Sequence, residues 1–178
     1  MKMTDIIVVG AGPAGLTAAI YALRAGKSVL VLEKENFGGQ VNYSPKIENY
    51  PGFTNISGSE LADLLVEQAL AQGAQLDLEQ VTSVKREPDG FVVYTDSGEH
   101  KCKAVIIATG AKHRHLNVPG EEKYIGNGIS FCAVCDGAFY SDQHVCVIGG
   151  GNSALQEALL LAETSSKVTI LQNLDFFT

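Results

Sequence analysis

The clearest chemistry in this chain lies in two cysteines separated by two residues, Cys132 and Cys135, with Asp136 directly after them. Two thiols at this spacing can meet in a small disulfide ring, and a helix that begins at the pair would lower the pKa of a thiol there. A thiolate is the species that attacks in disulfide exchange. The carboxyl group of Asp136 is close enough to donate or accept a proton in that chemistry. The pattern therefore predicts a redox-active dithiol with an acid/base partner.

A zinc site is the alternative interpretation of a close cysteine pair, but it needs a second pair of ligands. The two remaining cysteines, Cys102 and Cys146, are single and lie in strand-like segments, so we expect both to be small core residues. No metal site is predicted. The four histidines show no metal-ligand grouping, and we expect surface or turn positions for them: His100, His113, His115 and His144.

A glycine motif near the N-terminus predicts a nucleotide-binding βαβ unit. The apolar run 6–9 suits a buried parallel strand, and the motif 10–15 opens a helix that continues to about Ala25. Residues 29–33 form the next strand. This order of strand, glycine turn, helix and strand is typical of a dinucleotide-binding fold.

Each glycine of this motif has a physical task. Gly10 permits the tight turn, Gly12 lets the backbone approach a pyrophosphate, and Gly15 lets the helix pack on the strand. The helix N-terminus offers unsatisfied N–H groups and its dipole to the phosphates. Glu33, at the end of the second strand, is placed to accept hydrogen bonds from a ribose. The alternative is a βαβ unit whose glycines serve packing alone.

The same pattern recurs near the C-terminus, because adding 139 to a residue number in the first unit gives its counterpart in the second. Two copies of one βαβ unit imply two nucleotide sites, although packing alone remains the alternative for the second copy as well. The second copy keeps the turn but has a glutamine in place of the acid. Gly10, Gly12, Gly15, Val29 and Glu33 correspond to Gly149, Gly151, Ala154, Val168 and Gln172.

Composition and charge exclude several other classes of protein. The 178 residues are 46% hydrophobic, and the net charge of −7 includes no Lys/Arg cluster, so no nucleic-acid partner is expected. No stretch approaches the roughly 18 apolar residues of a membrane span, and the N-terminal apolar run is too short for a secretion signal. We therefore expect a cytoplasmic protein with no membrane partner. In that compartment a close cysteine pair is more often catalytic or metal-binding than structural.

Between the two units the sequence predicts a loop, a helix and three strands. Residues 36–55 are rich in Gly, Asn, Pro and aromatics, which is typical of an ordered, functional loop. Ser57 and Glu60 match a capping box at the start of a helix that continues to Gly73. Strands are expected as a small antiparallel hairpin feeding one more parallel strand, at about 75–85, 91–96 and 103–108.

The fold class that follows is α/β, with two Rossmann-like βαβ units in a three-layer arrangement. Residues 110–127 have the glycines and prolines of a crossing between domains. We place an incomplete first nucleotide-binding domain at 1–114. The start of a second domain, carrying the dithiol and a pyridine nucleotide site, is placed at 115–178.

Taken together, the motifs resemble the low-molecular-weight thioredoxin reductase family of FAD-dependent pyridine nucleotide-disulfide oxidoreductases. They span nearly the whole chain in that family's order. The segments that carry the resemblance are 10–15, Gly38-Gly39-Gln40, Glu48-Asn49-Tyr50-Pro51-Gly52, Ala108-Thr109-Gly110, 132–137 and 149–154.

The resemblance implies electron flow from a reduced donor through FAD to the Cys132–Cys135 disulfide, and on to thioredoxin or a thioredoxin-like protein. Asp136 would be the acid/base partner, and the second domain would rotate to present nicotinamide and dithiol alternately to the flavin. A homodimeric full-length parent is expected. In the first domain the implied cofactor-binding residues are Gly10, Gly12, Pro13, Ala14, Gly15, Glu33, Lys34, Gly39, Gln40, Asn49, Val81, Thr109 and Gly110. In the second they are Gly149, Gly151, Asn152, Ser153 and Ala154.

Two departures from that family bear on function. Members that use NADPH carry His-Arg-Arg after the second unit's strand, because guanidinium groups pair with the ribose 2′-phosphate. This chain has Gln172, Asn173 and Leu174 there, which leaves the donor open between NADPH, NADH and another donor such as ferredoxin. The chain also stops just after that strand, so we expect an N-terminal fragment with a truncated second domain. Its uncovered apolar faces would be exposed or would drive association.

Two other functions fit the same motifs. One is a dithiol oxidase that returns electrons to oxygen, or a flavin subunit that reduces a peroxidase. The other is a non-catalytic nucleotide-binding or assembly module, which the truncation motivates.

Overall fold

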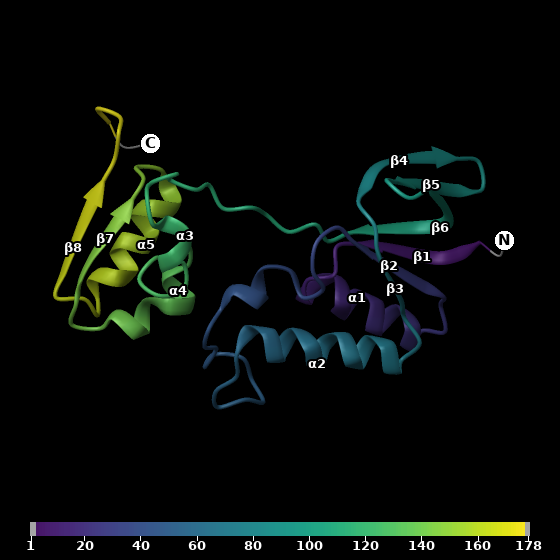
Figure 1. Cartoon of the computed structure of the whole chain (residues 1–178), viewed down its shortest axis with the longest axis horizontal. Coiled ribbons are helices and arrows are strands. Elements are labelled where there is room, and N and C mark those ends of the chain that lie inside the picture. The colour runs from purple at the N-terminus through teal and green to yellow at the C-terminus, as the bar shows by residue number, and fades with distance from the viewer. Residues whose placement is uncertain (1–2, 177–178) are drawn as a thin grey trace. The chain divides into compact units, whose positions relative to one another are not determined.

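A computed structural model describes residues 3–176 and divides the chain into two compact units, one ending at Lys112 and one beginning at His113 (Figure 1). The boundary expected from the sequence, at 114/115, lies two residues further along. Both expected βαβ repeats are present. The first consists of β1 (Thr4–Val9), α1 (Pro13–Arg24) and β2 (Val29–Glu33), and the second of β7 (His144–Ile148), α5 (Asn152–Ala162) and β8 (Lys167–Leu171).

The first unit is built on a six-stranded sheet with the order β3-β2-β1-β6-β5-β4. Strands β1, β2, β3 and β6 pair in parallel, whereas β4 and β5 pair antiparallel and join the sheet at β6. A parallel sheet with a small antiparallel extension is the arrangement that the sequence predicts. The remaining strands are β3 (Gln75–Leu78), β4 (Val81–Glu87), β5 (Gly90–Thr95) and β6 (Glu99–Ile107).

The core of the first unit lies on both faces of the parallel strands, because successive strand residues point to opposite faces. On one face, Val8 packs with Leu16 of α1 and with Leu61 of α2 (Gly58–Ala71). On the other face, Ile7 packs with Val93 of β5. Helices therefore form one outer layer of this unit, and β5 of the antiparallel extension packs on the opposite face of the parallel strands.

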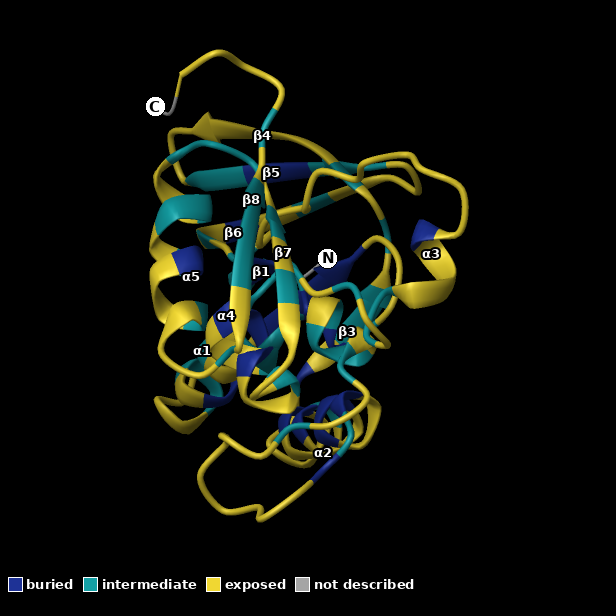
Figure 2. Cartoon of the chain, turned by 90° about the vertical axis from the view of Figure 1, so that its left-hand side faces the viewer, coloured by how far each residue is buried: buried dark blue, intermediate teal, exposed yellow. Residues whose placement is uncertain are grey.

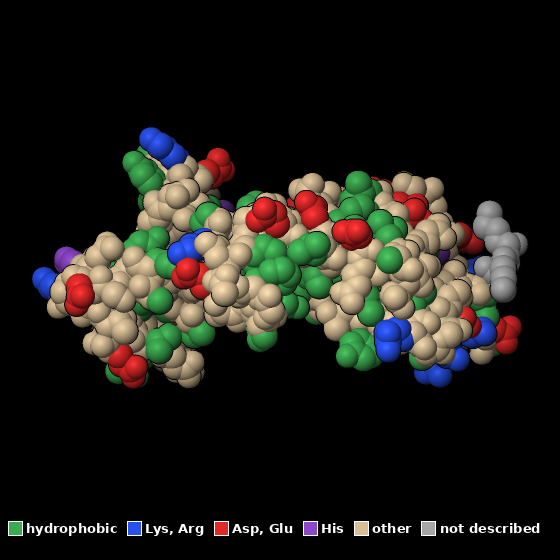
Figure 3. Space-filling view, turned by 90° about the horizontal axis from the view of Figure 1, so that it is seen from below, with side chains coloured by type: hydrophobic (Ala, Val, Ile, Leu, Met, Phe, Trp, Pro, Cys, Tyr) green, Lys and Arg blue, Asp and Glu red, His purple; other side chains and the backbone are tan. Residues whose placement is uncertain are grey.

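Helix α2 begins at the capping box that the sequence indicates. The Ser57 hydroxyl accepts a hydrogen bond from the amide of Glu60 at 3.2 Å, and the Glu60 carboxylate accepts one from the amide of Ser57 at 3.1 Å. On the outer surface, Phe53 and Leu64 line a shallow pocket with carboxylates of the helix such as Asp63. Figure 3 views the chain from below and shows acidic and hydrophobic side chains side by side on this face. The buried face of α2 thus carries the packing, and its outer face is acidic with apolar patches.

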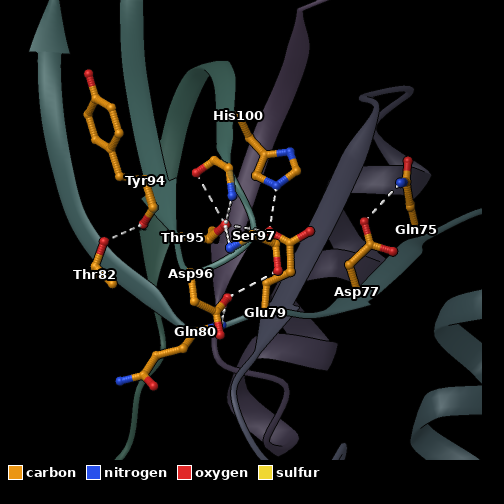
Figure 4. Close-up of polar contacts among 11 residues, drawn as sticks. Gln75, Asp77, Glu79, Gln80, Thr82, Tyr94, Thr95, Asp96, Ser97 and His100 are labelled. Atoms are coloured by element: carbon orange, nitrogen blue, oxygen red, sulfur yellow. Dashed lines mark hydrogen bonds and ion pairs between the residues drawn. The ribbon is translucent and has the colours of Figure 1, made fainter.

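The single strand expected at 75–85 is wrong, because the chain turns between β3 and β4 at Glu79 and Gln80. The hydroxyl of Thr95 donates to the Glu79 carboxylate at 2.6 Å, and Nε2 of His100 lies 2.8 Å from the same oxygen (Figure 4). These contacts hold the point where the chain leaves its parallel pairing with β2 and begins antiparallel pairing with β5. They also place His100 in a half-buried hydrogen bond with Glu79, not in the surface or turn position expected for it.

Strand β6 begins at Glu99, four residues before the expected start at 103. The extra residues pair antiparallel with β5, from Tyr94↔Glu99 to Phe91↔Cys102. One long strand therefore serves both the antiparallel extension and the parallel sheet.

The second unit has a two-stranded parallel sheet of β7 and β8 beside α5. Its shorter elements are α3 (Glu121–Tyr124), α4 (Ala133–Asp136) and the 3-10 helix η2 (Gly137–Tyr140). Figure 2 shows mainly exposed and intermediate residues on β7 and β8. Ile148 of β7 is 54% exposed, and Leu159 of α5 is 73% exposed. Cys146 is exposed on β7, which corrects its expected place in a core, whereas Cys102 is buried as expected. No helix among residues 3–176 is long and apolar enough to cross a membrane.

Candidate redox and nucleotide-binding sites

The two cysteines of the pair are joined by a disulfide, with their Cα atoms 5.3 Å apart. Cys132 is the N-cap residue of α4, as expected for a helix that begins at the pair. The backbone N–H of Cys135 donates to Sγ of Cys132 at 3.2 Å. Because a donor at a helix N-terminus stabilises negative charge on sulfur, this contact favours a thiolate at Cys132 after reduction.

Asp136 closes the same short helix, and a serine holds its carboxylate. The hydroxyl of Ser130 donates to Oδ2 of Asp136 at 2.6 Å and accepts the backbone N–H of Cys132 at 3.0 Å. One hydroxyl therefore links the candidate proton donor to the first cysteine. Sequence reasoning missed Ser130, although its position two residues before Cys132 was available as a signal.

A second carboxylate reaches the dithiol segment from α5. Oε2 of Glu157 accepts the backbone N–H of Ala133 at 3.2 Å. Glu157 was not singled out from the sequence, because 24 residues separate it from Ala133 and only the folding of α5 against α4 brings them together. Among residues 3–176, no group of three or more His, Cys, Asp or Glu side chains could hold a metal ion.

The disulfide lies at the surface of the chain. Cys135 is exposed and Cys132 is partly buried. Between them Val134 is 73% exposed, and Phe139 in η2 is 37% exposed. A partner protein could therefore approach the disulfide over an apolar surface.

In the first unit, two glycines of the motif, Gly10 and Gly15, lie where the backbone leaves no room for a side chain. Gly10 has φ +103°, and a Cβ there would lie 2.3 Å from the carbonyl oxygen of Ala108. A Cβ at Gly15 would lie 1.9 Å from the carbonyl oxygen of Gly10, so a side chain at either position would collide with backbone. Gly12 is different, because the nearest atom to a Cβ there is 3.8 Å away. It caps α1 with no side-chain hydrogen bond, which leaves the helix N-terminus open to an anion.

Glu33 is buried at the end of β2 and folds back onto the glycine motif. Its Oε2 accepts the amide N–H of Ala11 at 2.9 Å, and its Oε1 accepts those of Lys34 at 2.9 Å and Glu35 at 3.1 Å. These bonds fix the carboxylate beside the motif, where a ribose hydroxyl could donate to its remaining lone pairs.

The loop after β2 brings a third segment to the same place. Gly39 begins the 3-10 helix η1 (Gly39–Tyr43), and a Cβ there would lie 3.2 Å from Cα of Gly12. The Asn42 amide supports this turn by donating to the carbonyl groups of Phe37 at 2.8 Å and Gly39 at 3.2 Å. The structure thus gathers five of the sequence-predicted residues from separate segments: Gly10, Gly12, Glu33, Gly39 and Thr109.

Other residues expected at the FAD site lie apart from these contacts. Lys34 is exposed and pairs with Glu35 at 3.4 Å. Val81 begins β4 and packs on the second face of the core. The structure describes Gln40, Asn49 and Gly110 as exposed, and their roles at a flavin stay predictions.

The second unit repeats the first in backbone detail. Val145 pairs with Val168 as Ile6 pairs with Val29, each shifted by 139 residues. The amide of Gly149 donates to Leu171 at 2.8 Å, as that of Gly10 donates to Leu32 at 2.8 Å. Gly151 caps α5 with extended backbone and no side-chain bond, and Asn152 and Ser153 follow it as exposed residues of the first turn with Ala154 behind them.

A surface disulfide at a helix N-terminus, beside a nucleotide-type βαβ unit, defines a class: the nucleotide-dependent dithiol oxidoreductases. The family model described as pyridine nucleotide-disulphide oxidoreductase matches residues 4–178. The chain therefore belongs to that family, and the resemblance to its thioredoxin reductase members is confirmed by the individual relatives.

Thioredoxin reductase of Treponema pallidum is 45% identical over 172 residues, which cover 96% of this chain and 56% of that protein. The bifunctional thioredoxin reductase/thioredoxin of Mycobacterium leprae is 47% identical over 175 residues, covering 97% and 38%. The crystal structure of thioredoxin reductase from Streptococcus pyogenes superposes with a TM-score of 0.93 at 45% identity, covering 98% of this chain and 57% of that one. The chain thus spans about half the length of such relatives.

Proposed function

We propose that the protein acts as a flavin-dependent thiol-disulfide oxidoreductase of the thioredoxin reductase type. The observation that carries this proposal is the Cys132–Cys135 disulfide at the start of α4, with Asp136 beside it, in a chain that also holds two nucleotide-type βαβ units. A dithiol can transfer only two electrons before it must be reduced again. A nucleotide site in the same chain would bind the cofactor that reduces it. Family membership supports the same combination.

The first unit fits FAD. Gly12 leaves open space beside the uncapped N-terminus of α1, where a pyrophosphate would accept backbone hydrogen bonds. Glu33 would bind the ribose, and Gly39 and Thr109 would line the flavin side. FAD, when bound, supplies two-electron transfer from the donor to the disulfide. The chain's own residues would bind and orient the cofactor, and Asp136 would donate and accept protons at the dithiol.

The second unit would bind the donor nucleotide at Gly149, Gly151 and the first turn of α5. NADPH, NADH and a non-nucleotide donor remain the candidates. Because the positions where family members that use NADPH carry His-Arg-Arg are occupied here by Gln172, Asn173 and Leu174, we favour NADH over NADPH as the nucleotide.

The reduced pair would act on a partner disulfide by exchange. The Cys132 thiolate attacks one partner sulfur to form a mixed disulfide, and Asp136 donates a proton to the partner thiolate that leaves. Cys135 then attacks Sγ of Cys132, which restores the Cys132–Cys135 disulfide and expels the second partner thiolate, and the proton lost by the Cys135 thiol passes to that thiolate. Two electrons and two protons pass to the partner. We assign the first attack to Cys132 because the amide of Cys135 stabilises its charge.

Thioredoxin is the proposed partner. The named activity of the relatives supports it, and so does the bifunctional relative that carries both proteins in one chain. The exposed apolar residues beside the disulfide would offer it a docking surface. A dithiol oxidase remains the competing function, since it needs the same cofactor and dithiol.

The proposal is tested with reduced Cys135→Ser and Cys132→Ser chains, both in a Cys146→Ser background because Cys146 is an exposed free thiol, and a thioredoxin activated as its mixed disulfide with thionitrobenzoate. We expect rapid thionitrobenzoate release and a trapped complex with Cys135→Ser, and much slower release with Cys132→Ser. Equal rates would overturn the assignment of Cys132. If neither variant forms a complex, and a small dithiol with FAD-loaded protein yields peroxide, the oxidase is the function.

A further inference from the structure

Glu157 contacts the dithiol helix from outside the cysteine motif. Its Oε2 accepts the N–H of Ala133 at 3.2 Å, and Ala133 is the buried first residue of α4, directly after Cys132. Glu157 itself is half-buried on α5. A negative charge therefore lies at the N-terminal end of the helix on which the cysteine pair is built.

The position of this charge opposes the usual activation of a thiol. Backbone N–H groups that point at a thiol stabilise its thiolate by hydrogen bonding. Here the N–H of Cys135 does point at Cys132 Sγ, but the N–H of Ala133 is taken up by Glu157. A neighbouring carboxylate also disfavours a second negative charge. Glu157 thus removes one donor from the first turn and adds repulsion.

We propose that Glu157 is a positioning residue that holds the dithiol segment through Ala133 and makes the Cys132 thiolate less favourable. A dithiol that ionises less readily is a stronger reductant, because thiolate formation stabilises the reduced state. Such tuning suits a pair that must pass electrons on to another disulfide, a benefit that rests on the proposed function. The electrostatic effect itself does not depend on FAD or on a partner.

The matched variant is Glu157→Gln, which keeps an oxygen acceptor for the Ala133 N–H and removes only the charge. It is compared with the parent chain in a Cys146→Ser background, because the exposed Cys146 thiol would otherwise react as well. The reduced chains are alkylated with iodoacetamide across a pH series, and the label on Cys132 is distinguished from that on the exposed Cys135 by peptide mass spectrometry. We expect the Cys132 rate at pH 7 to rise about threefold and the pH midpoint of the profile to fall by about half a unit.

The same chains are then equilibrated with glutathione. Two glutathione molecules reduce the Cys132–Cys135 disulfide to two thiols and leave one glutathione disulfide, a transfer of two electrons and two protons. At a pH above the midpoint of the alkylation profile, we expect the equilibrium for Glu157→Gln to shift about twofold toward the dithiol. A merely structural role of Glu157 would leave both the pH midpoint and this equilibrium unchanged.

Two further variants separate charge from general damage. Glu163→Gln makes the same charge change at the C-terminal end of α5 and should reproduce the parent profile. Glu157→Asp keeps the charge, so its pH midpoint and glutathione equilibrium should lie closer to those of the parent than the values for Glu157→Gln do. The inference is overturned if Glu157→Gln, with an unchanged circular dichroism spectrum, gives the parent's midpoint and equilibrium. A chain that shows the expected shifts but does not reduce thioredoxin would overturn only the proposed function.

Discussion

The side chain of Gln172 lies against Gly150, where a Cβ would come within 2.3 Å of its Oε1. These two positions repeat Glu33 and Ala11 of the first unit, where the carboxylate accepts the amide at 2.9 Å. Both side chains end the second strand of their repeat and fold back onto the glycine motif. The difference is charge, since Gln172 carries a neutral amide, which donates to the Leu174 carbonyl at 2.6 Å.

Replacing Gln172 by Arg should therefore raise the preference for NADP⁺ over NAD⁺ by about tenfold, which corresponds to about 1.4 kcal/mol. The physical reason is that a guanidinium group pairs with the ribose 2′-phosphate and gains nothing from a ribose hydroxyl. The measurement is titration calorimetry of the chain with each nucleotide. Gln172→Glu is the matched control and should move the ratio the opposite way. Parallel changes for both nucleotides would mean that the side chain does not face the ribose.

Gly12→Ala should leave the fold intact and weaken FAD binding by at least about tenfold. Gly12 has an ordinary φ of −74° and open space around a Cβ, so the free energy of unfolding should change by less than about 0.5 kcal/mol. The added methyl group would occupy the space that the pyrophosphate needs. Flavin content after reconstitution and urea unfolding give the two readings. Full retention of FAD would place the pyrophosphate elsewhere.

Gly15→Ala, in contrast to Gly12→Ala, should mainly lower the free energy of unfolding. Its Cβ would lie 1.9 Å from the Gly10 carbonyl oxygen, which belongs to backbone and cannot rotate away. We expect a loss of about 3 kcal/mol in the free energy of unfolding, near the upper end for overpacking. The urea midpoint of the apo chain measures it. A midpoint equal to that of Gly12→Ala would show that α1 and β1 adjust freely.

Much of this architecture was predictable because its signals are local. The glycine turn, the buried strand and the Ser57 capping box are each encoded within a few neighbouring residues. The second βαβ unit was predictable because its sequence repeats the first at a spacing of 139 residues. The cysteine pair is a local signal as well, because two thiols separated by two residues can meet in a disulfide.

What the sequence did not predict depends on contacts between distant segments. The turn at Glu79 is held by Thr95 and His100, which lie 16 and 21 residues away, so a continuous strand was predicted across it. Glu157 meets Ala133 only after α5 folds against α4. Cys146 lies in a strand as expected, but it is exposed while its neighbours Val145 and Val147 are half-buried, so its burial depends on which face of β7 another layer covers.

Asp136→Asn should lower the turnover of the dithiol about 100-fold, since it removes a proton donor but keeps the shape of the side chain. Ser130→Ala should have a smaller effect, about tenfold, because it removes only the 2.6 Å hydrogen bond that orients the carboxylate. Ser130→Thr retains a hydroxyl and is the control. Turnover is measured as reduction of thioredoxin by the FAD-loaded protein, with flavin content checked in each variant. A Ser130→Ala variant as slow as Asp136→Asn would indicate that the serine does more than orient.

Glu79→Gln should reduce the loss of stability in acid. Hydrogen bonds from Thr95 and His100 hold the pKa of Glu79 below its ordinary value. A lowered pKa in the folded state contributes stability above the unfolded pKa, near 4.3, and loses it as the pH falls through the folded value. The parent chain should therefore lose more of its urea midpoint between pH 6 and pH 3 than the variant, which cannot titrate at this position. Glu99→Gln, a change of the same charge at the exposed start of β6, controls for net charge. Identical pH profiles for the parent and Glu79→Gln would show that the Glu79 carboxylate gains nothing from Thr95 and His100 on folding.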